Sequence, residues 1–382
     1  MQENKNLRKN KKLIEYYIKI EKYEKEIKMV KAIYLCSLSE RVGKSLLSIG
    51  MMLKLQKEGK KVAYFKPIGV PKGAFSNKAD RDVGFIQSTV FKTHLPYDII
   101  SPISIPDCYY VDLIDASKKD ENLRMIKNAF DELSKKYEYI IIEGAPSIKK
   151  YIRVGLDDVS VAQSLGINEL VFIQTESSDK CIDTLFFTKK YFDFREINIK
   201  GVIFNKVDHD YMARIEELRK NHIERYNIPI IGMLEKRLLL LSPRVSEIKE
   251  AIGGELINEI AAEGLSSIVE TYIIAAMNVQ AALKYLRSVR KAVVITGGDR
   301  TDVILAALKE DVCGLVLTGF IQPDAAVIYA ANEKKIPIIL SPSDTYTTIR
   351  NMERIKPGIQ EEEVNLVLQL MEENINWDIL FR

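Results

Sequence analysis

Cysteine and histidine are scarce in this sequence, which has four cysteines and three histidines among 382 residues. The cysteines, at positions 36, 108, 181 and 313, have neither paired spacing nor a histidine partner, so we expect no zinc cluster and no disulfide framework. Long apolar runs are also missing. The leucine run 238–241 is far shorter than the roughly 20 residues that a membrane-spanning helix needs. We therefore expect a soluble protein in a reducing, cytoplasmic compartment, without a membrane partner.

A strong excess of charge is absent as well, because the net charge is only +3. Residues 1–28 hold nine lysines or arginines against five acidic residues, which leaves the remaining sequence close to neutral. A nucleic-acid-binding protein usually carries a basic field on its folded body. The charge distribution therefore argues against nucleic acid as a partner.

Apolar residues of the leading segment recur at spacings of three and four, from Leu13 through Ile20 to Val30. This spacing predicts an amphipathic helical extension over residues 1–29. The pattern covers too few heptads for a coiled coil, so we expect a helix packed on its own domain or an irregular extension. Because Met29 directly precedes the first expected strand, both Met1 and Met29 are candidates for the start of translation.

From residue 30 onward, short runs rich in β-branched residues alternate with helical stretches. This alternation is typical of βαβ units and predicts an α/β fold whose parallel sheet is covered by helices on both faces. We expect strands over 32–36, 62–65, 139–142, 170–174, 202–204 and 229–234.

A second, smaller α/β domain is expected after Gly253 and Gly254, which close a helix that starts near residue 243. Here the pattern predicts helices over 266–277, 281–287, 302–309 and 325–332, and strands over 292–296, 315–318 and 336–340. The predicted organisation is an extension at 1–29, a first domain at 30–254, a second at 255–356, and a terminal helix and tail at 357–382.

The run from Ser37 to Ser45, SLSERVGKS, lies where the first strand should end and the first helix should begin. Unpaired N–H groups and the helix dipole favour a bound phosphate at such a position. Gly43 allows the backbone to come close, Lys44 can reach the phosphates and the Ser45 hydroxyl can hold Mg²⁺. The alternative is an ordinary loop and helix cap. We favour a nucleotide-phosphate loop made of Glu40, Arg41, Val42, Gly43, Lys44 and Ser45.

An acidic side chain should accompany such a loop, because Mg²⁺ needs oxygen ligands beside the phosphates. Glu143 ends the expected strand 139–142, which places it at the carboxyl edge of the sheet, where ligands of open α/β folds bind. Lys66 ends the strand 62–65 at the same edge and could neutralise a phosphoryl group or an anionic substrate. For both residues the alternative is a solvated charge at a strand end.

Three segments together, 40–45, YFKPIG at 64–69 and IEGA at 142–145, resemble dethiobiotin synthetase, the cobyrinic acid amidation enzymes and the synthetase-like region of long phosphate acetyltransferases. The resemblance covers about residues 30–250 and implies a P-loop NTPase fold that binds ATP and Mg²⁺. By position it implies that Lys44 and Lys66 contact phosphate or substrate. It further implies that Ser45, Asp82 and Glu143 are magnesium ligands and that Asn205 reads adenine, while Asp80 is an alternative to Asp82.

The sequence departs from the synthetases at two places. Ser37 stands where their loop has a glycine, and Ile68, Gly69 and Val70 replace the polar residues that would hold the diamine substrate. These departures favour nucleotide binding without the synthetase reaction.

The run GGDRTD at 297–302 resembles the signature of the DRTGG domain, which follows the synthetase-like region in long phosphate acetyltransferases. Thr301 or Asp299 could cap the next helix, whose N–H groups and Arg300 would suit a small anion. The alternative is a tight turn without a ligand. The residues expected to contact such an anionic ligand are Gly297, Gly298, Asp299, Arg300 and Thr301.

The favoured function is that of an ATP- and Mg²⁺-binding protein related to the amino-terminal regulatory half of phosphate acetyltransferase, with a nucleotide-dependent regulatory or sensing role. We expect it to form a homo-oligomer and to lack the acyl-transfer domain. The alternative is an ATP-dependent ligase that activates a carboxylate or CO₂ for attack by an amine. A third interpretation is a nucleotide sensor that binds another subunit through its second domain.

Overall fold

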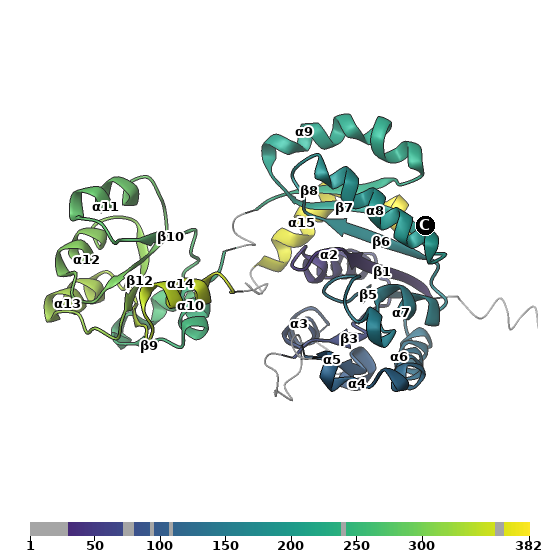
Figure 1. Ribbon diagram of the computed structural model, residues 1–382, viewed down its shortest axis with the longest axis horizontal. Coiled ribbons are helices and arrows are strands. Elements are labelled where there is room, and N and C mark those ends of the chain that lie inside the picture. Colours follow the sequence, from purple (N-terminus) through teal and green to yellow (C-terminus); the bar gives the residue numbers. More distant parts are fainter. Residues whose placement is uncertain (1–29, 72–79, 92–94, 107–109, 238–241, 356–362) are drawn as a thin grey trace, which may run out of the picture. The chain divides into compact units, whose positions relative to one another are not determined.

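The computed structural model describes residues 30–71, 80–91, 95–106, 110–237, 242–355 and 363–382 (Figure 1). The helical extension predicted over 1–29 lies outside the described residues, as do Met29, Cys108 and the leucine run 238–241. The described residues form two compact units. One comprises the chain up to Lys236 together with the C-terminal segment ending at Arg382, and the other lies between Arg237 and Gln360.

The first unit is built on a parallel sheet with the strand order β2-β5-β1-β6-β7-β8. Each strand includes one of the segments predicted from the apolar runs, except that the predicted segment 229–234 begins one residue before its strand. The strands are β1 (Lys31–Ser37), β2 (Val62–Phe65), β5 (Tyr139–Glu143), β6 (Glu169–Gln174), β7 (Asn198–Val207) and β8 (Ile230–Glu235).

Crossover handedness decides which face of the sheet each helix covers. The connection from β1 to β2 moves toward the β2 edge of the sheet, whereas every later connection moves toward the β8 edge. Because such crossovers are right-handed, α2 lies on one face and the other crossover helices lie on the opposite face. Tyr34 and Phe172 of the sheet share the core of the other face with Phe130, Val159 and Leu185 of its helices. The crossover helices are α2 (Lys44–Lys57), α6 (Lys119–Ser134), α7 (Asp158–Ser164), α8 (Lys180–Phe194) and α9 (His209–Leu218).

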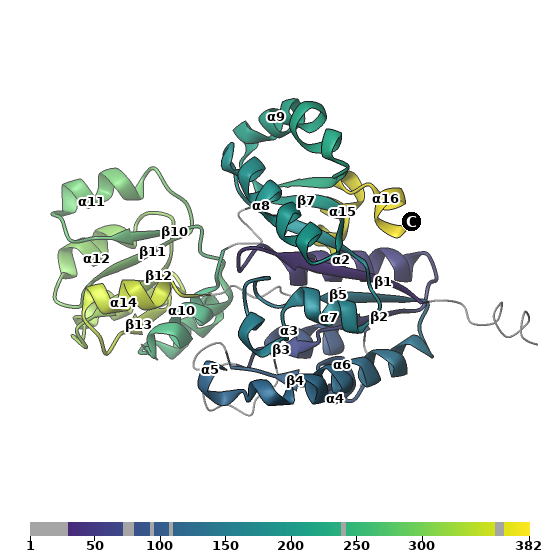
Figure 2. The same ribbon diagram turned by 45° about the vertical axis from the view of Figure 1, so that its right-hand side comes forward.

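The C-terminal segment lies on the same face of the sheet as α2 and covers the part of that face which α2 does not reach. Helix α15 (Val364–Asn374) packs on α2 and β8, and α16 (Trp377–Phe381) follows it (Figure 2). A Cβ atom on Gly50 of α2 would lie 2.0 Å from Met371 Sδ, so the two helices approach closely at this glycine. The segment predicted as a terminal helix and tail is therefore part of the first unit.

Short elements lie beside the carboxyl edge of this sheet. Strands β3 (Ile68–Gly69) and β4 (Ile103–Ser104) pair in parallel after β2. The short helices are α3 (Arg81–Phe85), which continues into a π-helical turn (Ile86–Phe91), α4 (Tyr97–Ile100) and α5 (Tyr110–Leu113). None of the helices within the described ranges is long and apolar enough to cross a membrane.

The second unit is a five-stranded sheet in the order β10-β11-β12-β13-β9, in which only β9 runs antiparallel to its neighbour. Helices pack on both faces. The strands are β9 (Glu255–Leu256), β10 (Thr271–Ile274), β11 (Ala292–Gly297), β12 (Val312–Thr318) and β13 (Ile338–Leu340). The helices are α10 (Val245–Ile252), α11 (Val279–Leu286), α12 (Thr301–Ala307), α13 (Ala325–Glu333) and α14 (Thr345–Met352).

Two sequence predictions for this region differ from the structure. The helix predicted over 266–277 is wrong, because the TYII segment of β10 pairs with β11, as its β-branched and aromatic residues favour. Helix α10, which the sequence placed in the first domain, packs in the second unit, where Val245 and Ile248 share a core with Val293 and Val316.

Candidate functional site

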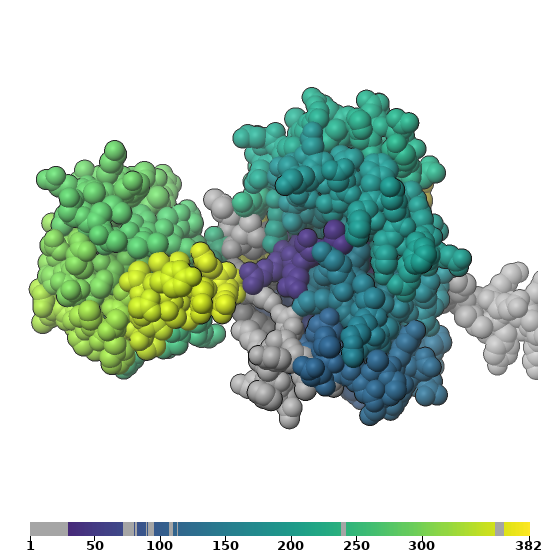
Figure 3. Space-filling view, in the orientation of Figure 1, coloured from purple at the N-terminus to yellow at the C-terminus, as the bar shows by residue number. Residues whose placement is uncertain are grey.

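The loop between β1 and α2 has the backbone of an anion-binding turn. Gly43 has a φ of 95° and Arg41 a φ of 59°, so the loop makes a left-handed turn directly before α2. Within the described part of the chain, the N–H groups of residues 41–45 donate no hydrogen bond. Ser39, Glu40 and Arg41 are exposed, and the purple atoms at the surface in Figure 3 belong to this early part of the chain. The loop can therefore receive an anion from solvent.

Lys44 is held inside this loop. Its Nζ donates to Ser37 Oγ at 2.7 Å and to the Pro146 carbonyl at 3.1 Å, and the side chain is buried. Burial lowers the pKa of Lys44, while the carboxylates of Asp158 and Glu143 oppose that shift. Ser37, which replaces the glycine of the synthetase pattern, thus supplies a direct partner for this lysine.

Ser45 contacts the other two expected magnesium ligands, Asp82 and Glu143. Its Oγ lies 2.9 Å from Asp82 Oδ2 and 3.1 Å from Glu143 Oε1, so the two carboxylates share its one hydroxyl proton. The second Glu143 oxygen accepts from the Tyr64 hydroxyl at 2.9 Å. Burial raises the pKa of Glu143, and the ammonium of Lys66 opposes this. Three side chains that are far apart in the sequence therefore place oxygen atoms at one point.

Lys66 supplies a positive charge inside this acidic cluster. Its Nζ lies 2.9 Å from Asp80 Oδ2, 3.3 Å from Glu143 Oε1 and 3.6 Å from Asp82 Oδ2. Burial alone would lower the pKa of Lys66, but the attraction of Glu143, Asp82 and Asp80 outweighs it and raises the pKa. The lysine thus stays charged among three carboxylates.

The structure distinguishes Asp80 from Asp82. Asp80 caps α3, because its Oδ1 accepts the N–H group of Asp82 at 2.9 Å, and its Oδ2 accepts the N–H group of Val70 at 2.8 Å. Asp82 is instead partly exposed, with 43% of its side chain accessible, and faces the Ser45 hydroxyl. Asp82 is therefore the better placed of the two for a cation.

Asn205 supports the loop from β7. Its Nδ2 donates to the Val42 carbonyl at 2.8 Å, and a Cβ atom on Gly43 would lie only 2.4 Å from that Nδ2. Lys206 Nζ donates to the Arg41 carbonyl at 2.8 Å. On the other side of the loop, Glu40 pairs with Lys150 at 2.8 Å. These contacts position the loop, whereas a role of Asn205 in reading adenine stays a prediction.

Asp158 is a buried residue of the site that the sequence analysis missed. Its Oδ1 accepts the N–H group of Ala145 at 2.7 Å and the hydroxyl of Tyr34 at 3.0 Å, while Oδ2 has no partner among the described residues. Burial raises the pKa of Asp158 to about 6. It holds the turn after Glu143, whose Pro146 carbonyl binds Lys44. Asp158 stands at the start of α7, where an aspartate is usually a helix cap, so its place in the sequence carries no signal for this role.

The arrangement can hold an anion and a hard cation side by side. N–H groups and Lys44 suit phosphate, and the oxygens of Ser45, Asp82 and Glu143 suit Mg²⁺. Among the described residues, no group of three or more histidine, cysteine or acidic side chains is arranged to hold a metal by itself. A cation here would therefore need further oxygens, and phosphate oxygens are the natural source.

The motif of the second unit lies in the turn from β11 to α12. Gly298 is required sterically, because a Cβ atom there would lie 1.8 Å from the Ile321 carbonyl oxygen. Arg300 Nη2 donates to the Met277 carbonyl at 2.7 Å. The predicted side-chain cap is wrong, because neither Asp299 nor Thr301 caps α12, and the Thr301 hydroxyl binds Asp324 instead. A small anionic ligand at this turn stays a prediction.

Two family models match the chain. An AAA domain matches residues 31–244 and a DRTGG domain matches residues 247–355. The predicted combination of a P-loop domain with a DRTGG domain is thereby confirmed.

Curated relatives include several phosphate acetyltransferases. The chain is 26% identical over 369 residues to that of Nitratidesulfovibrio vulgaris, which covers 90% of this chain and 50% of that protein. It is 22% identical over 345 residues to that of Synechocystis, covering 87% of this chain and 48% of that protein. The chain therefore spans about half the length of these relatives. This agrees with the predicted similarity to the amino-terminal half of long phosphate acetyltransferases.

Solved structures are similar only loosely. The septum site-determining protein MinD of Pyrococcus horikoshii, complexed with Mg-ADP, matches with a TM-score of 0.34 and 14% identity, over 56% of this chain and 84% of that one. The CBS and DRTGG domains of Clostridium perfringens pyrophosphatase match with a TM-score of 0.28 and 15% identity, over 49% of this chain and 82% of that one.

Proposed function

Because this chain belongs to the AAA domain family over residues 31–244 and carries a DRTGG domain over 247–355, we propose that it binds ATP with Mg²⁺ and uses the bound nucleotide as a regulatory signal. The observation that carries this proposal is the meeting of Ser45, Asp82 and Glu143 beside a loop whose N–H groups are free to bind phosphate. When bound, Mg²⁺ would neutralise phosphate charge and fix the nucleotide in one geometry.

Different residues of the site would hold the phosphates and the cation. Lys44 and the N–H groups of residues 41–45 would bind phosphate oxygens, and Ser45, Asp82 and Glu143 would ligate the cation. Lys66 offsets part of the negative charge of the acidic cluster and leaves a net negative charge that can attract the cation. Asn205 sets the conformation of the loop through Val42.

A regulatory role rather than ligation is favoured by the segment that follows Lys66. Ile68 is buried and pairs in β3, so this segment offers no polar side chain to a substrate. A sensing role is also favoured by the chain path. The segment after the second unit folds into α15, which packs on α2, the helix that begins at Lys44. The helix that begins at the phosphate loop is therefore covered by the segment that follows the second unit in the sequence.

The test is calorimetric titration of the full chain with Mg-ATP, with Mg-GTP as a comparison for base preference. Lys44→Ala removes a charge-assisted contact worth about 1.5–3 kcal/mol, so we expect affinity to fall by about tenfold or more. Lys60→Ala, an exposed lysine after α2, is the matched control and should bind normally. Unchanged affinity in Lys44→Ala would contradict the phosphate contact.

An ADP-release assay separates the regulator from the ligase. A regulator should bind ATP with little turnover and change its oligomeric state, a homo-oligomer being expected, when ATP is added. A ligase should release ADP only when an amine and a carboxylate or CO₂ are supplied. Light scattering with and without Mg-ATP measures the first outcome.

A further inference from the structure

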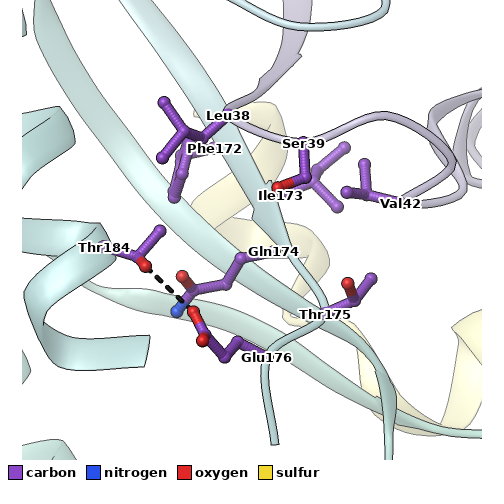
Figure 4. A pocket seen from close by; sticks show the side chains of 9 residues that line it. All are labelled: Leu38, Ser39, Val42, Phe172, Ile173, Gln174, Thr175, Glu176 and Thr184. Atoms are coloured by element: carbon purple, nitrogen blue, oxygen red, sulfur yellow. Dashed lines mark hydrogen bonds between the residues drawn. The ribbon is translucent and has the colours of Figure 1, made fainter. Parts of the chain in front are cut away.

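A cavity of about 270 Å³ lies beside the candidate phosphate loop, within the first unit. Its apolar wall is formed by Leu38 and Val42 of the loop and by Phe172 and Ile173 at the end of β6 (Figure 4). The nucleotide contacts described above use the backbone of Val42 but not the apolar side chains of this wall. An apolar cavity of this size can enclose the body of a small organic molecule.

The polar end of the cavity carries an acceptor without a partner. Gln174 is only 4% exposed, and its Nε2 donates to the Cys181 carbonyl at 3.3 Å. This bond fixes the amide, so Oε1 is left as the free acceptor, and it has no hydrogen-bond partner among the described residues. A buried acceptor without a donor is costly, so a ligand that brings a donor is favoured there.

Glu176 adds a negative charge to the same end of the cavity. Thr184 of α8 donates to its Oε2 at 2.9 Å, which orients the carboxylate, and Figure 4 draws the polar ends of these two side chains near the Gln174 amide. No hydrogen bond to Glu176 Oε1 is present among the described residues. Of the described side chains that line the cavity, only Glu176 is charged. The cavity therefore opposes an anion and suits a cation with N–H donors.

We propose that this cavity binds a small molecule with a primary ammonium group and an apolar body. The ammonium has three donors, which match the carbonyl oxygen of Gln174 and the carboxylate of Glu176, and the apolar body packs on Phe172 and Ile173. This site goes beyond nucleotide binding, since its polar contacts are Gln174 and Glu176, neither of which is assigned to the phosphates or the cation.

The cavity shares residues with the phosphate loop. Ser39 and Val42 line it, and the Val42 carbonyl is the acceptor that Asn205 holds. An amine in the cavity would therefore contact the same loop that Asn205 holds. Such a ligand should change nucleotide affinity, and by linkage the nucleotide should change amine affinity by the same factor.

The experiment titrates the full chain with 2-phenylethylammonium, followed by NMR or calorimetry, with the anionic isostere 3-phenylpropionate as the comparison. We expect saturable binding of the amine and none of the anion. Glu176→Gln keeps an acceptor for Thr184 but removes the charge, and Gln174→Met removes the amide acceptor. Each should weaken amine binding by roughly tenfold.

Two controls keep this test separate from the nucleotide proposal. Glu196→Gln changes an exposed glutamate just after α8 and should bind the amine normally. Lys44→Ala should lose Mg-ATP but keep the amine, so failure of one proposal leaves the other measurable. The amine site is overturned if the wild type shows no saturable binding, if the anion binds as tightly, or if folded Glu176→Gln and Gln174→Met bind like the wild type.

Discussion

The carboxylate of Glu143 lies 3.1 Å from the hydroxyl of Ser45, although 98 positions separate the two residues in the chain. Glu143 ends β5 and Ser45 stands in the first turn of α2, so the parallel pairing of β1 with β5 brings them together. This relationship links the phosphate loop to the cation ligands.

Glu143→Gln should weaken binding of Mg-ATP more than binding of ATP in EDTA, because the amide keeps the shape but loses the charge that attracts the cation. We expect a loss of about tenfold in Mg²⁺-dependent affinity. Calorimetry with and without Mg²⁺ gives both constants. Equal losses under the two conditions would mean that Glu143 acts on the fold and not on the cation.

Gly43→Ala should impair nucleotide binding. The residue has a φ of 95°, and its new Cβ would lie 2.4 Å from Asn205 Nδ2, so the contact between Asn205 and Val42 must break. Gly59→Ala is the matched control, since Gly59 has a φ of 71° but no atom near its missing Cβ. A similar drop in affinity in both variants would assign the effect to backbone strain alone.

Asp158→Asn tests the buried carboxylate through the pH dependence of stability. The pKa of Asp158 is raised to about 6 from the ordinary aspartate value of 3.8, so the folded state binds the proton more tightly than the unfolded state. Its contribution to stability is therefore greatest at low pH and is lost as pH rises through about 6. The asparagine variant should lack this dependence, which amounts to about 2 kcal/mol between pH 4 and pH 8.

The measurement is urea unfolding of both proteins at several pH values. The asparagine amide places a donor where Oδ2 has no partner, which shifts the stability of the variant by a constant amount and does not affect the slope. Parallel stability curves for the two proteins would contradict a raised pKa at Asp158.

Gly298→Ala should destabilise the second unit strongly, because the new Cβ would lie 1.8 Å from the backbone oxygen of Ile321 and a backbone atom cannot move away cheaply. Thermal unfolding should show a loss of about 2 kcal/mol or more. Gly84→Ala, where no atom lies near the missing Cβ, is the control. An unchanged transition in Gly298→Ala would mean that the turn relaxes freely.

The positions of the strands in the sequence and the edge of the sheet that carries the site could be predicted, because the local apolar pattern and the geometry of parallel sheets agree there. Apolar runs such as 62–65 form buried strands, and the residues that directly follow parallel strands meet at one edge. Lys44, Lys66 and Glu143 were therefore predicted to lie together, and they do.

Other features depend on contacts between distant segments, which local pattern does not contain. Helix α14, rich in threonine, was not predicted, although Asp344 caps it by accepting the N–H group of Thr347. The position of α15 depends on the fit between Gly50 and Met371. The role of Asp158 depends on the N–H group of Ala145 in a turn of the chain that the sequence did not connect to it.

The most direct test of the account is binding of Mn²⁺, as a substitute for Mg²⁺, followed by electron paramagnetic resonance. We predict that the full chain holds Mn²⁺ tightly only when ATP is present, and that Ser45→Ala abolishes most of this ATP-dependent binding. Mn²⁺ that binds equally well without ATP, or ATP-dependent binding that survives Ser45→Ala unchanged, would contradict it.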